Sequence, residues 1–275
     1  MYSLEFFSMN KSAMSLRMSI NPRAVNVLYR TIAARRGQTV MKCAQKEGLE
    51  PSAYVIEALR HSKAICFDVD STFCQDESID EIAKFLGVGE EVAALTSRAM
   101  GGTMDFKSAL EGRLSIMAPT QRDIENFLMK HPHQITQGIP ELVKLLQAQN
   151  KAVFLVSGGF RQIIHPLAIH LGIPLENVFA NSLVFKADGT YAGFDENEFT
   201  CRSGGKPAAI RHIKETFFLE PVVMVGDGAT DLEARLEGAA DLFIGYGGVV
   251  ERRNVAEKAD WYIYNIQQMI DILAH

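Results

Sequence analysis

Three short apolar segments of the sequence each end abruptly in polar residues. They comprise residues 64–67, 151–156 and 221–225, which are rich in β-branched or aromatic side chains and show no polar alternation. Such segments are typical of strands buried on both faces of a parallel sheet. Stretches of helical periodicity lie between them, so the pattern predicts a βαβ rhythm and an α/β fold with a Rossmann-like parallel sheet flanked by helices.

The stretch between the first two predicted strands is helical throughout. Apolar residues recur there at helical spacing, Pro119-Thr120 marks a helix start, and no strand-like segment occurs from Asp80 to about Gln134. A block of this length exceeds an ordinary crossover, so we expect a small helical cap inserted after the first strand. The predicted domains are an N-terminal extension (1–50), an α/β core (51–79 and 135–275) and the cap (80–134).

Other segments show weaker local signals. We expect a helix over Ala53–Arg60 opened by Pro51, a second helix over 138–148, and a hairpin within 182–194. Residues 242–244 read as one more strand followed by a glycine-containing loop. Ser157-Gly158-Gly159-Phe160 is expected to open the helix after the second strand, where outward-facing N–H groups beside a hydroxyl would form an anion cradle.

The polar residues that follow the strands are expected to meet at one place. Asp68 and Asp70 follow the first strand, Ser157 the second, and Asp227 and Asp231 the third. Ligands of such sheets bind in the crevice outside the carboxyl ends of the strands. An isolated Asp-x-Asp is more often an ordinary strand end, but three strand ends with polar chemistry favour a shared site.

The chemistry of these groups indicates phosphoryl transfer. Oxygen ligands without His or Cys select Mg²⁺ rather than zinc. Lys206, placed just before a predicted helix where a cation is disfavoured by the helix dipole, suggests an anionic partner. Positive charge and N–H groups around a metal suit a phosphoryl group. A carboxylate beside the metal can act as nucleophile and form an acyl phosphate that water hydrolyses.

The composition is that of an ordinary soluble globular protein. The chain has 275 residues, 47% of them hydrophobic, and a formal net charge of −5. The acidic balance argues against nucleic acid as a partner, and no apolar stretch reaches the roughly 18 residues that span a bilayer. The chain has four cysteines, and none of them shows Cys-x-x-Cys spacing: Cys43, Cys66, Cys74 and Cys201. We expect them to be reduced thiols, which implies an intracellular protein.

The first 42 residues differ from the rest of the chain. They hold seven Lys or Arg residues against a single acid, Glu5, with several Ser. This composition is typical of organelle transit peptides, and a disordered extension without an address is the equal alternative. The predicted location is therefore cytoplasmic, or plastid or mitochondrial if the extension is a transit peptide.

Taken together, the motifs resemble those of the phosphoserine phosphatases, a family of the haloacid dehalogenase (HAD) superfamily. The resemblance covers the chain from about residue 54 to its end, and residues 1–50 lie outside it. The superfamily motifs are Asp68-Val-Asp70-Ser-Thr72, Ser157-Gly158-Gly159, Lys206 and Gly226-Asp227-Gly228-Ala-Thr-Asp231. The motifs specific to the family include Glu77-x-Ile79-Asp80-Glu81, Arg98-Ala-Met100-Gly101-Gly102, Arg113-Leu114, Asn177-Val-Phe-Ala-Asn181 and Ser203-Gly-Gly-Lys206. Phe73-Cys74 and Ser78 depart from the family pattern without touching the chemical positions.

The resemblance implies a Mg²⁺-dependent hydrolysis of O-phospho-L-serine, the last step of L-serine biosynthesis. Asp68 would be the nucleophile and Asp70 the acid and base. Mg²⁺ would be held by Asp68, by the Asp70 backbone carbonyl and by Asp227, with Asp231 supporting these ligands. The residues implied to contact the phosphate are Ser157, Gly158, Gly159 and Lys206. Glu77 would bind the substrate ammonium and Arg113 its carboxylate. The residues implied to line the substrate pocket are Met100, Gly101 and Thr230.

Three alternatives remain open from the sequence. The first is a HAD phosphatase or phosphotransferase acting on another small phosphomonoester, against which Glu77 and Arg113 argue. The second is a signalling receiver domain, which would have no helical cap and about half this length. The third is a binding protein without activity, which the intact chemical positions disfavour. The expected partner is a small molecule, with neither nucleic acid nor membrane, and a homodimer is compatible with the sequence.

Overall fold

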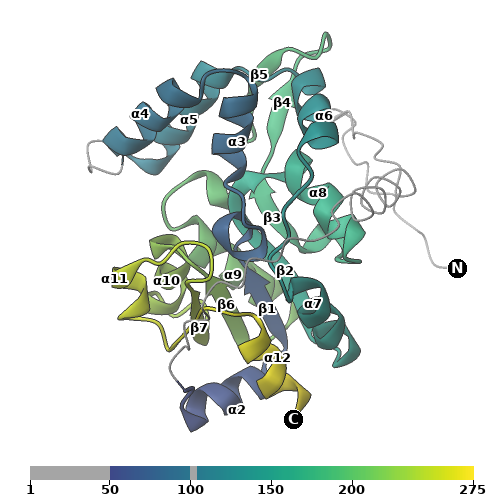
Figure 1. Cartoon of the computed structure of the whole chain (residues 1–275), viewed down its shortest axis with the longest axis vertical. Helices are drawn as coiled ribbons and strands as arrows, with labels where there is room; N and C mark the ends of the chain where they lie inside the picture. The colour runs from purple at the N-terminus through teal and green to yellow at the C-terminus, as the bar shows by residue number, and fades with distance from the viewer. Residues whose placement is uncertain (1–49, 100–103) are drawn as a thin grey trace, which may run out of the picture.

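The computed structural model describes residues 50–99 and 104–275 and contains a six-stranded parallel sheet (Figure 1). The strand order is β3-β2-β1-β6-β7-β8, so β1 lies between β2 and β6. The bounds are β1 (Ala64–Phe67), β2 (Ala152–Phe160), β3 (Val178–Asn181), β6 (Val222–Gly226), β7 (Leu242–Tyr246) and β8 (Trp261–Ile263). Every residue of β1 and β6 is buried, as expected for central strands. The predicted α/β fold with a parallel sheet is confirmed.

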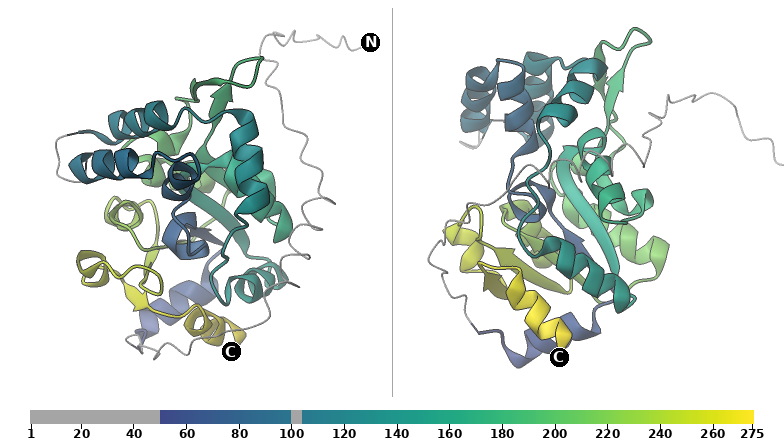
Figure 2. Two further views of the ribbon diagram at one scale, coloured as in Figure 1. Left: turned by 45° about the horizontal axis from the view of Figure 1, so that its top comes forward. Right: turned by 45° about the vertical axis from the view of Figure 1, so that its right-hand side comes forward.

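Helices cover both faces of the sheet (Figure 2). Because side chains alternate along a strand, Ile65 and Phe67 of β1 belong to one hydrophobic cluster and Ala64 and Cys66 to the other. The first cluster includes residues of α2 (Ala53–His61), α7 (Ile139–Ala148), α8 (Arg161–His170) and α12 (Gln267–Ala274). The second includes residues of α9 (Gly205–Phe217), α10 (Ala229–Leu236) and α11 (Arg253–Ala256).

Four helices follow β1 in sequence and lie above the carboxyl edge of the sheet (Figure 1). They are α3 (Ser78–Phe85), α4 (Gly89–Arg98), α5 (Phe106–Met117) and α6 (Gln121–Lys130). The start of α6 has the predicted signal, since the Thr120 hydroxyl accepts from the Asp123 N–H and Asp123 accepts in return from the Thr120 N–H. Ile82, Leu110 and Ile124 form a third hydrophobic cluster, separate from the two on the sheet.

The hairpin of β4 (Leu183–Phe185) and β5 (Tyr191–Phe194) packs on this third cluster, through Leu183 and partly buried aromatic side chains. Its tip is also held by α6, because the Gln121 N–H donates to the Gly189 carbonyl at 2.9 Å. The hairpin itself was predicted, but its packing against the cap helices was not. The domain bounds 51–79, 80–134 and 135–275 stay a prediction.

The prediction that Ser157-Gly158-Gly159-Phe160 opens a helix is wrong. Strand β2 continues to Phe160, and α8 begins at Arg161. Two contacts explain the extension: Phe160 is buried in the cap cluster, and the Asn181 side-chain amide donates to the Gly158 carbonyl at 2.8 Å. The pairing with β3 shifts register between Val156 and Phe160, so the glycines form an irregular part of the strand.

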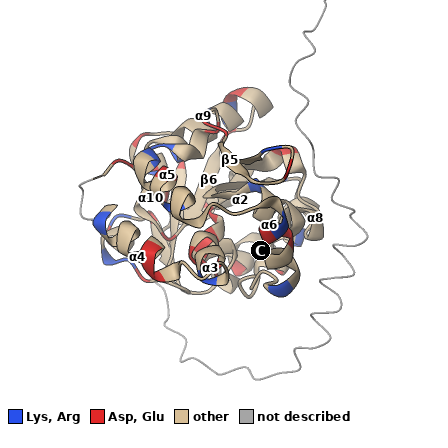
Figure 3. Ribbon diagram, turned by 90° about the horizontal axis from the view of Figure 1, so that it is seen from above, with Lys and Arg blue, Asp and Glu red and all other residues tan. Residues whose placement is uncertain are grey.

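Other local predictions were close to the structure. Helix α2 starts one residue after its N-cap Ser52, whose hydroxyl accepts from the Val55 N–H at 3.3 Å, so Pro51 precedes the cap rather than opening the helix. Cys66, Cys74 and Cys201 are buried free thiols, and Cys43 lies outside the described residues. Among the described helices, none has the length and apolar character needed to cross a membrane. Basic and acidic residues are interspersed on the side seen from above (Figure 3).

Candidate active site

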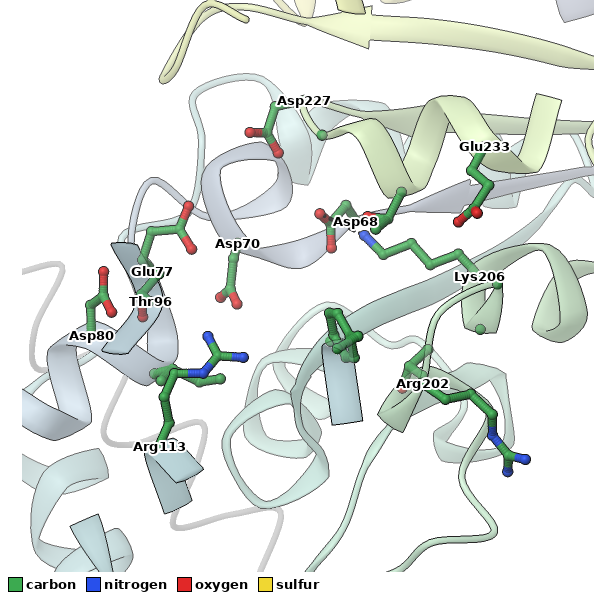
Figure 4. A pocket seen from close by; sticks show the side chains of 18 of the residues that line it. Asp68, Asp70, Glu77, Asp80, Thr96, Arg113, Arg202, Lys206, Asp227 and Glu233 are labelled. Atoms are coloured by element: carbon green, nitrogen blue, oxygen red, sulfur yellow. Dashed lines mark ion pairs between the residues drawn. The ribbon is translucent and has the colours of Figure 1, made fainter. Parts of the chain in front are cut away.

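A pocket of about 230 Å³ opens at the carboxyl edge of the sheet, beneath the cap helices (Figure 4). It draws residues from the segment after β1, from β2, from α9 and from the turn after β6, which are far apart in the sequence. Of the residues predicted for the site, those lining the pocket are Asp68, Asp70, Glu77, Arg113, Gly158, Lys206, Asp227 and Thr230. The structure therefore brings the strand ends together as the sequence predicted.

Lys206 lies at the centre of the acidic residues. Its ammonium is 2.8 Å from Asp68 Oδ2 and 2.6 Å from Asp231 Oδ1, and all three side chains are buried. Burial alone would lower the pKa of Lys206, but the charges of Asp231 and Asp68 outweigh it and raise the pKa. The lysine therefore carries a fixed positive charge beside the Asp68 carboxylate.

Asp231 is held on both oxygens, because Lys206 donates to Oδ1 and the Gly228 N–H donates to Oδ2 at 2.9 Å. Its carboxyl group packs directly on the backbone of Gly226. A Cβ atom at that position would lie 2.2 Å from Asp231 Cγ, closer than any side chain allows. Glycine at the end of β6 is thus a condition for the buried Asp231.

Asp70 has its carboxyl group fixed by Ser78, the first residue of α3. The Ser78 N–H donates to Oδ1 at 3.1 Å, and the Ser78 hydroxyl donates to Oδ2 at 3.0 Å. Burial, followed by the charges of Asp68 and Glu77, raises the pKa of Asp70 to about 8. A carboxyl group with such a pKa can carry a proton near neutral pH, as a general acid must.

Glu77 and Arg113 place opposite charges in the part of the pocket beneath the cap. The Glu77 carboxylate accepts from the Ser71 hydroxyl at 2.7 Å, and Arg113 reaches down from α5 with Nε donating to the Ala109 carbonyl at 3.2 Å. Figure 4 shows the Arg113 guanidinium directed into the pocket. Partial burial lowers the pKa of Arg113 and raises that of Glu77, but the Glu77 side chain is 48% exposed, so the need for an ionic partner is stronger at the guanidinium.

Arg252 is a pocket residue that the sequence analysis did not identify. Its Nε lies 2.8 Å from Asp227 Oδ2, and its Nη2 lies 4.0 Å from Glu77 Oε1. It follows β7 in the loop that the analysis had left as an unassigned glycine-containing segment. Ligands bind outside the carboxyl ends of parallel strands, and applying this rule to β7 as well would have identified this loop as part of the site.

Some predicted residues lie beside the pocket rather than in its wall. Ser157 is fully buried and its hydroxyl accepts from the Gly159 N–H at 2.9 Å. Neither Ser157 nor Gly159 lines the pocket, although a Cβ at Gly159 would come within 3.5 Å of Asp70 Oδ2. Met100 and Gly101 lie outside the described residues.

Three buried carboxylates lie close enough together to hold a metal ion. Oxygens of Asp68, Asp227 and Asp231 lie within 4.8 Å of one another. Asp68 and Asp227 line the pocket whereas the fully buried Asp231 does not, so Asp68 and Asp227 are the better placed to coordinate directly. The donor set consists of oxygen atoms alone, which suits a hard divalent cation.

Known proteins show the same combination of sequence and fold. A haloacid dehalogenase-like hydrolase profile matches residues 62–237. The chloroplastic phosphoserine phosphatase of Arabidopsis thaliana is 52% identical over 223 residues, which cover 81% of this chain and 76% of the plant protein. The phosphoserine phosphatase of Bos taurus is 50% identical over 210 residues, covering 76% of this chain and 92% of the bovine protein.

Solved structures agree with the fold. A substrate-bound phosphoserine phosphatase complex superposes with a TM-score of 0.65 at 29% identity, covering 76% of this chain and 97% of that chain. The structure of DsGPDH of Dunaliella salina superposes with a TM-score of 0.72 at 36% identity; the match covers 82% of this chain but 38% of the longer algal chain. The chain belongs to the haloacid dehalogenase-like hydrolases and, within them, to the phosphoserine phosphatase family.

Proposed function

We propose that this protein hydrolyses O-phospho-L-serine to L-serine and phosphate, through an aspartyl-phosphate intermediate and with Mg²⁺, as the last step of L-serine biosynthesis. The observation that carries the proposal is one pocket that combines two kinds of group. Asp68, Asp70 and Lys206 supply the chemistry of phosphoryl transfer, and Glu77 with Arg113 supplies opposite charges suited to an amino acid.

The proposed reaction has two steps. In the first, an Asp68 oxygen attacks phosphorus while the bond to the serine oxygen breaks, and Asp70 gives its proton to that oxygen. In the second, Asp70 takes a proton from water, whose oxygen attacks phosphorus and releases Asp68 and phosphate. The raised pKa of Asp70 supports both roles, because the group can hold and release a proton near neutral pH.

Charge neutralisation is assigned to Lys206 and to the metal. Lys206 lies against Asp68 and would stay beside the phosphoryl group throughout both steps. Asp68, Asp227 and the Asp70 backbone carbonyl would hold Mg²⁺, with Asp231 in support. When bound, the ion supplies positive charge at the phosphoryl oxygens. Ser157, Gly158 and Gly159 are proposed as further phosphate contacts; of these, only Gly158 lines the pocket.

The amino acid part of the substrate is assigned to Glu77 and Arg113. Arg113 would bind the carboxylate, for which a planar guanidinium with two parallel donors is well suited, and Glu77 would bind the ammonium. Thr230, which lines the pocket, and Met100 and Gly101 complete the proposed substrate contacts.

The decisive experiment is a phosphate-release assay with and without Mg²⁺ on phosphoserine, phosphothreonine, a sugar phosphate and a nucleotide. We expect phosphoserine to be preferred and activity to require the ion. Asp68→Asn serves as the control, because it removes the nucleophile while keeping the size of the side chain. Preference for the sugar phosphate or the nucleotide would favour the alternative, a HAD phosphatase or phosphotransferase acting on another small phosphomonoester.

The position of the protein in the cell is a separate proposal. We infer that residues 1–50 form a transit peptide for plastids, since their composition fits such a peptide and the Arabidopsis relative is described as chloroplastic. Fusing these residues to a fluorescent protein tests this directly. Diffuse cytoplasmic fluorescence would contradict a transit peptide, and mitochondrial fluorescence would contradict the plastid assignment.

A further inference from the structure

Ser78 is the one residue that binds both carboxyl oxygens of Asp70 within the described part of the chain. Its N–H reaches Oδ1 and its hydroxyl reaches Oδ2, at 3.1 and 3.0 Å. Two bonds to adjacent oxygens fix the plane of a carboxyl group, whereas one bond leaves it free to turn about its Cβ–Cγ bond. The Ser78 side chain is buried, so water competes poorly for these bonds.

The hydroxyl approaches Asp70 from the side away from the active-site pocket. Asp70 lines two cavities: the active-site pocket and a second one of about 100 Å³ between α3, α6 and the start of α8. Ser78 lines the second cavity and not the first. The bond therefore supports the carboxyl group from behind and leaves its front face open to a substrate.

Strand β2 closes the remaining side of this pair. A Cβ atom on Gly159 would lie 3.1 Å from Ser78 Oγ and 3.5 Å from Asp70 Oδ2. The backbone at Gly159 thus packs closely against both polar groups, and its lack of a side chain makes room for the hydroxyl. The Ser78 hydroxyl is confined between the strand and the carboxyl group that it binds.

We propose that the Ser78 hydroxyl is a positioning group, which holds Asp70 in the orientation that delivers its proton to the leaving oxygen of the substrate. The inference rests on the proposed function. The step it assists is the first one, in which the bond from phosphorus to the leaving oxygen breaks, the bond to Asp68 forms, and the proton moves from Asp70 to the leaving oxygen. Ser78 itself neither gains nor loses a proton in this step.

The test compares Ser78→Ala and Ser78→Gly with the unchanged protein on two substrates, phosphoserine and 4-nitrophenyl phosphate. A serine oxygen needs a proton to leave, whereas a nitrophenolate is stable as an anion. The quantity to compare is kcat/KM, because it reports steps only up to release of the first product. Both variants keep the backbone N–H bond to Asp70, and both are smaller than serine, so neither crowds Gly159.

We expect kcat/KM for phosphoserine to fall about tenfold, near the upper limit for loss of a hydrogen bond to an uncharged group, because Asp70 carries its proton in this step and the N–H bond persists. For 4-nitrophenyl phosphate we expect a change within about twofold. Ser97→Ala is the matched control, since that hydroxyl bonds the Ala93 carbonyl on the exposed side of α4. It should change neither value.

Two results would overturn the inference: unchanged kcat/KM for phosphoserine in both variants, or equal losses on both substrates. Equal losses would mean that Ser78 supports the fold of the site and not proton delivery. Failure of the proposed function is distinguishable, because it would show as an unchanged protein that releases no phosphate from phosphoserine while acting on 4-nitrophenyl phosphate.

Discussion

Replacing Lys206 with methionine should destabilise the protein strongly. The ammonium lies 2.8 Å from Asp68 Oδ2 and 2.6 Å from Asp231 Oδ1. At an effective dielectric constant of about 20, each attraction amounts to about 6 kcal/mol, and the cost of burying the charges offsets much of it. Methionine removes the attraction and leaves the carboxylates buried. We therefore expect the free energy of unfolding to fall by about 3–5 kcal/mol.

Urea unfolding at neutral pH without divalent cations measures this loss, which corresponds to a fall in melting temperature on the order of 10 °C. The matched control is the double variant Lys206→Met with Asp231→Asn, in which one of the two uncompensated charges is also removed. Because Asn keeps an oxygen for the Gly228 N–H, we expect the double variant to recover about 2 kcal/mol. A loss below about 1 kcal/mol in the single variant, or additive losses in the double variant, would refute the electrostatic reasoning.

Three further outcomes follow from the site and its surroundings. Arg113→Ala should lower kcat/KM for phosphoserine about a hundredfold, in the range for a buried charge-assisted bond. It should lower kcat/KM for a phosphomonoester without a carboxylate far less. Equal losses of kcat/KM on both substrates would contradict the proposed role of Arg113. Arg252→Ala should lower the melting temperature without Mg²⁺ and enlarge the stabilisation that Mg²⁺ provides, because Asp227 loses the guanidinium that lies 2.8 Å from its Oδ2. Thermal shift assays with and without Mg²⁺ measure both effects. An unchanged stabilisation by Mg²⁺ would contradict the reasoning. Burial, together with the positive charge of Arg161, lowers the pKa of His165 to about 4. As the pH falls, His165 is therefore protonated in the unfolded chain before it is protonated in the folded protein, and stability decreases as the pH drops from about 6.5 toward 4. His165→Leu should flatten that part of the pH profile in urea titrations, and an identical slope in both proteins would be inconsistent with a neutral, partly buried His165.

The sequence predicted the sheet and the position of the site because those features depend on simple periodicities. Strands β1, β2 and β6 are buried on both faces, so apolar residues without alternation identify them, and parallel strands place their carboxyl ends at one edge. Asp68 and Asp227 directly follow such strands, and their convergence needed no knowledge of the loops. Helical periodicity predicted the block that contains α3 to α6 for the same reason, without locating α4 individually.

The predictions failed where side-chain contacts between distant segments decide the structure. Ser157 and Gly159 were expected in a helix-opening turn, but Phe160 is buried in the cap cluster and Asn181 binds the Gly158 carbonyl, which keeps this segment in the strand. Neither contact has a signature in the residues around Ser157. The packing of Leu183 with the cap helices was missed for the same reason.

Arg252 shows why the final geometry of the site could not be read from the chain. It binds Asp227 and approaches Glu77, so three segments that are distant in sequence meet at one guanidinium. Glu77 is brought there by the turn after Asp70, in which Ser71 adopts a left-handed conformation with φ of 55° and its hydroxyl then binds the Glu77 carboxylate. Such a turn has no periodicity, and serine does not favour that conformation over others. The direction of a side chain beyond a strand end depends on these few dihedral angles, which is why residue types at the site were predictable and their pairing was not.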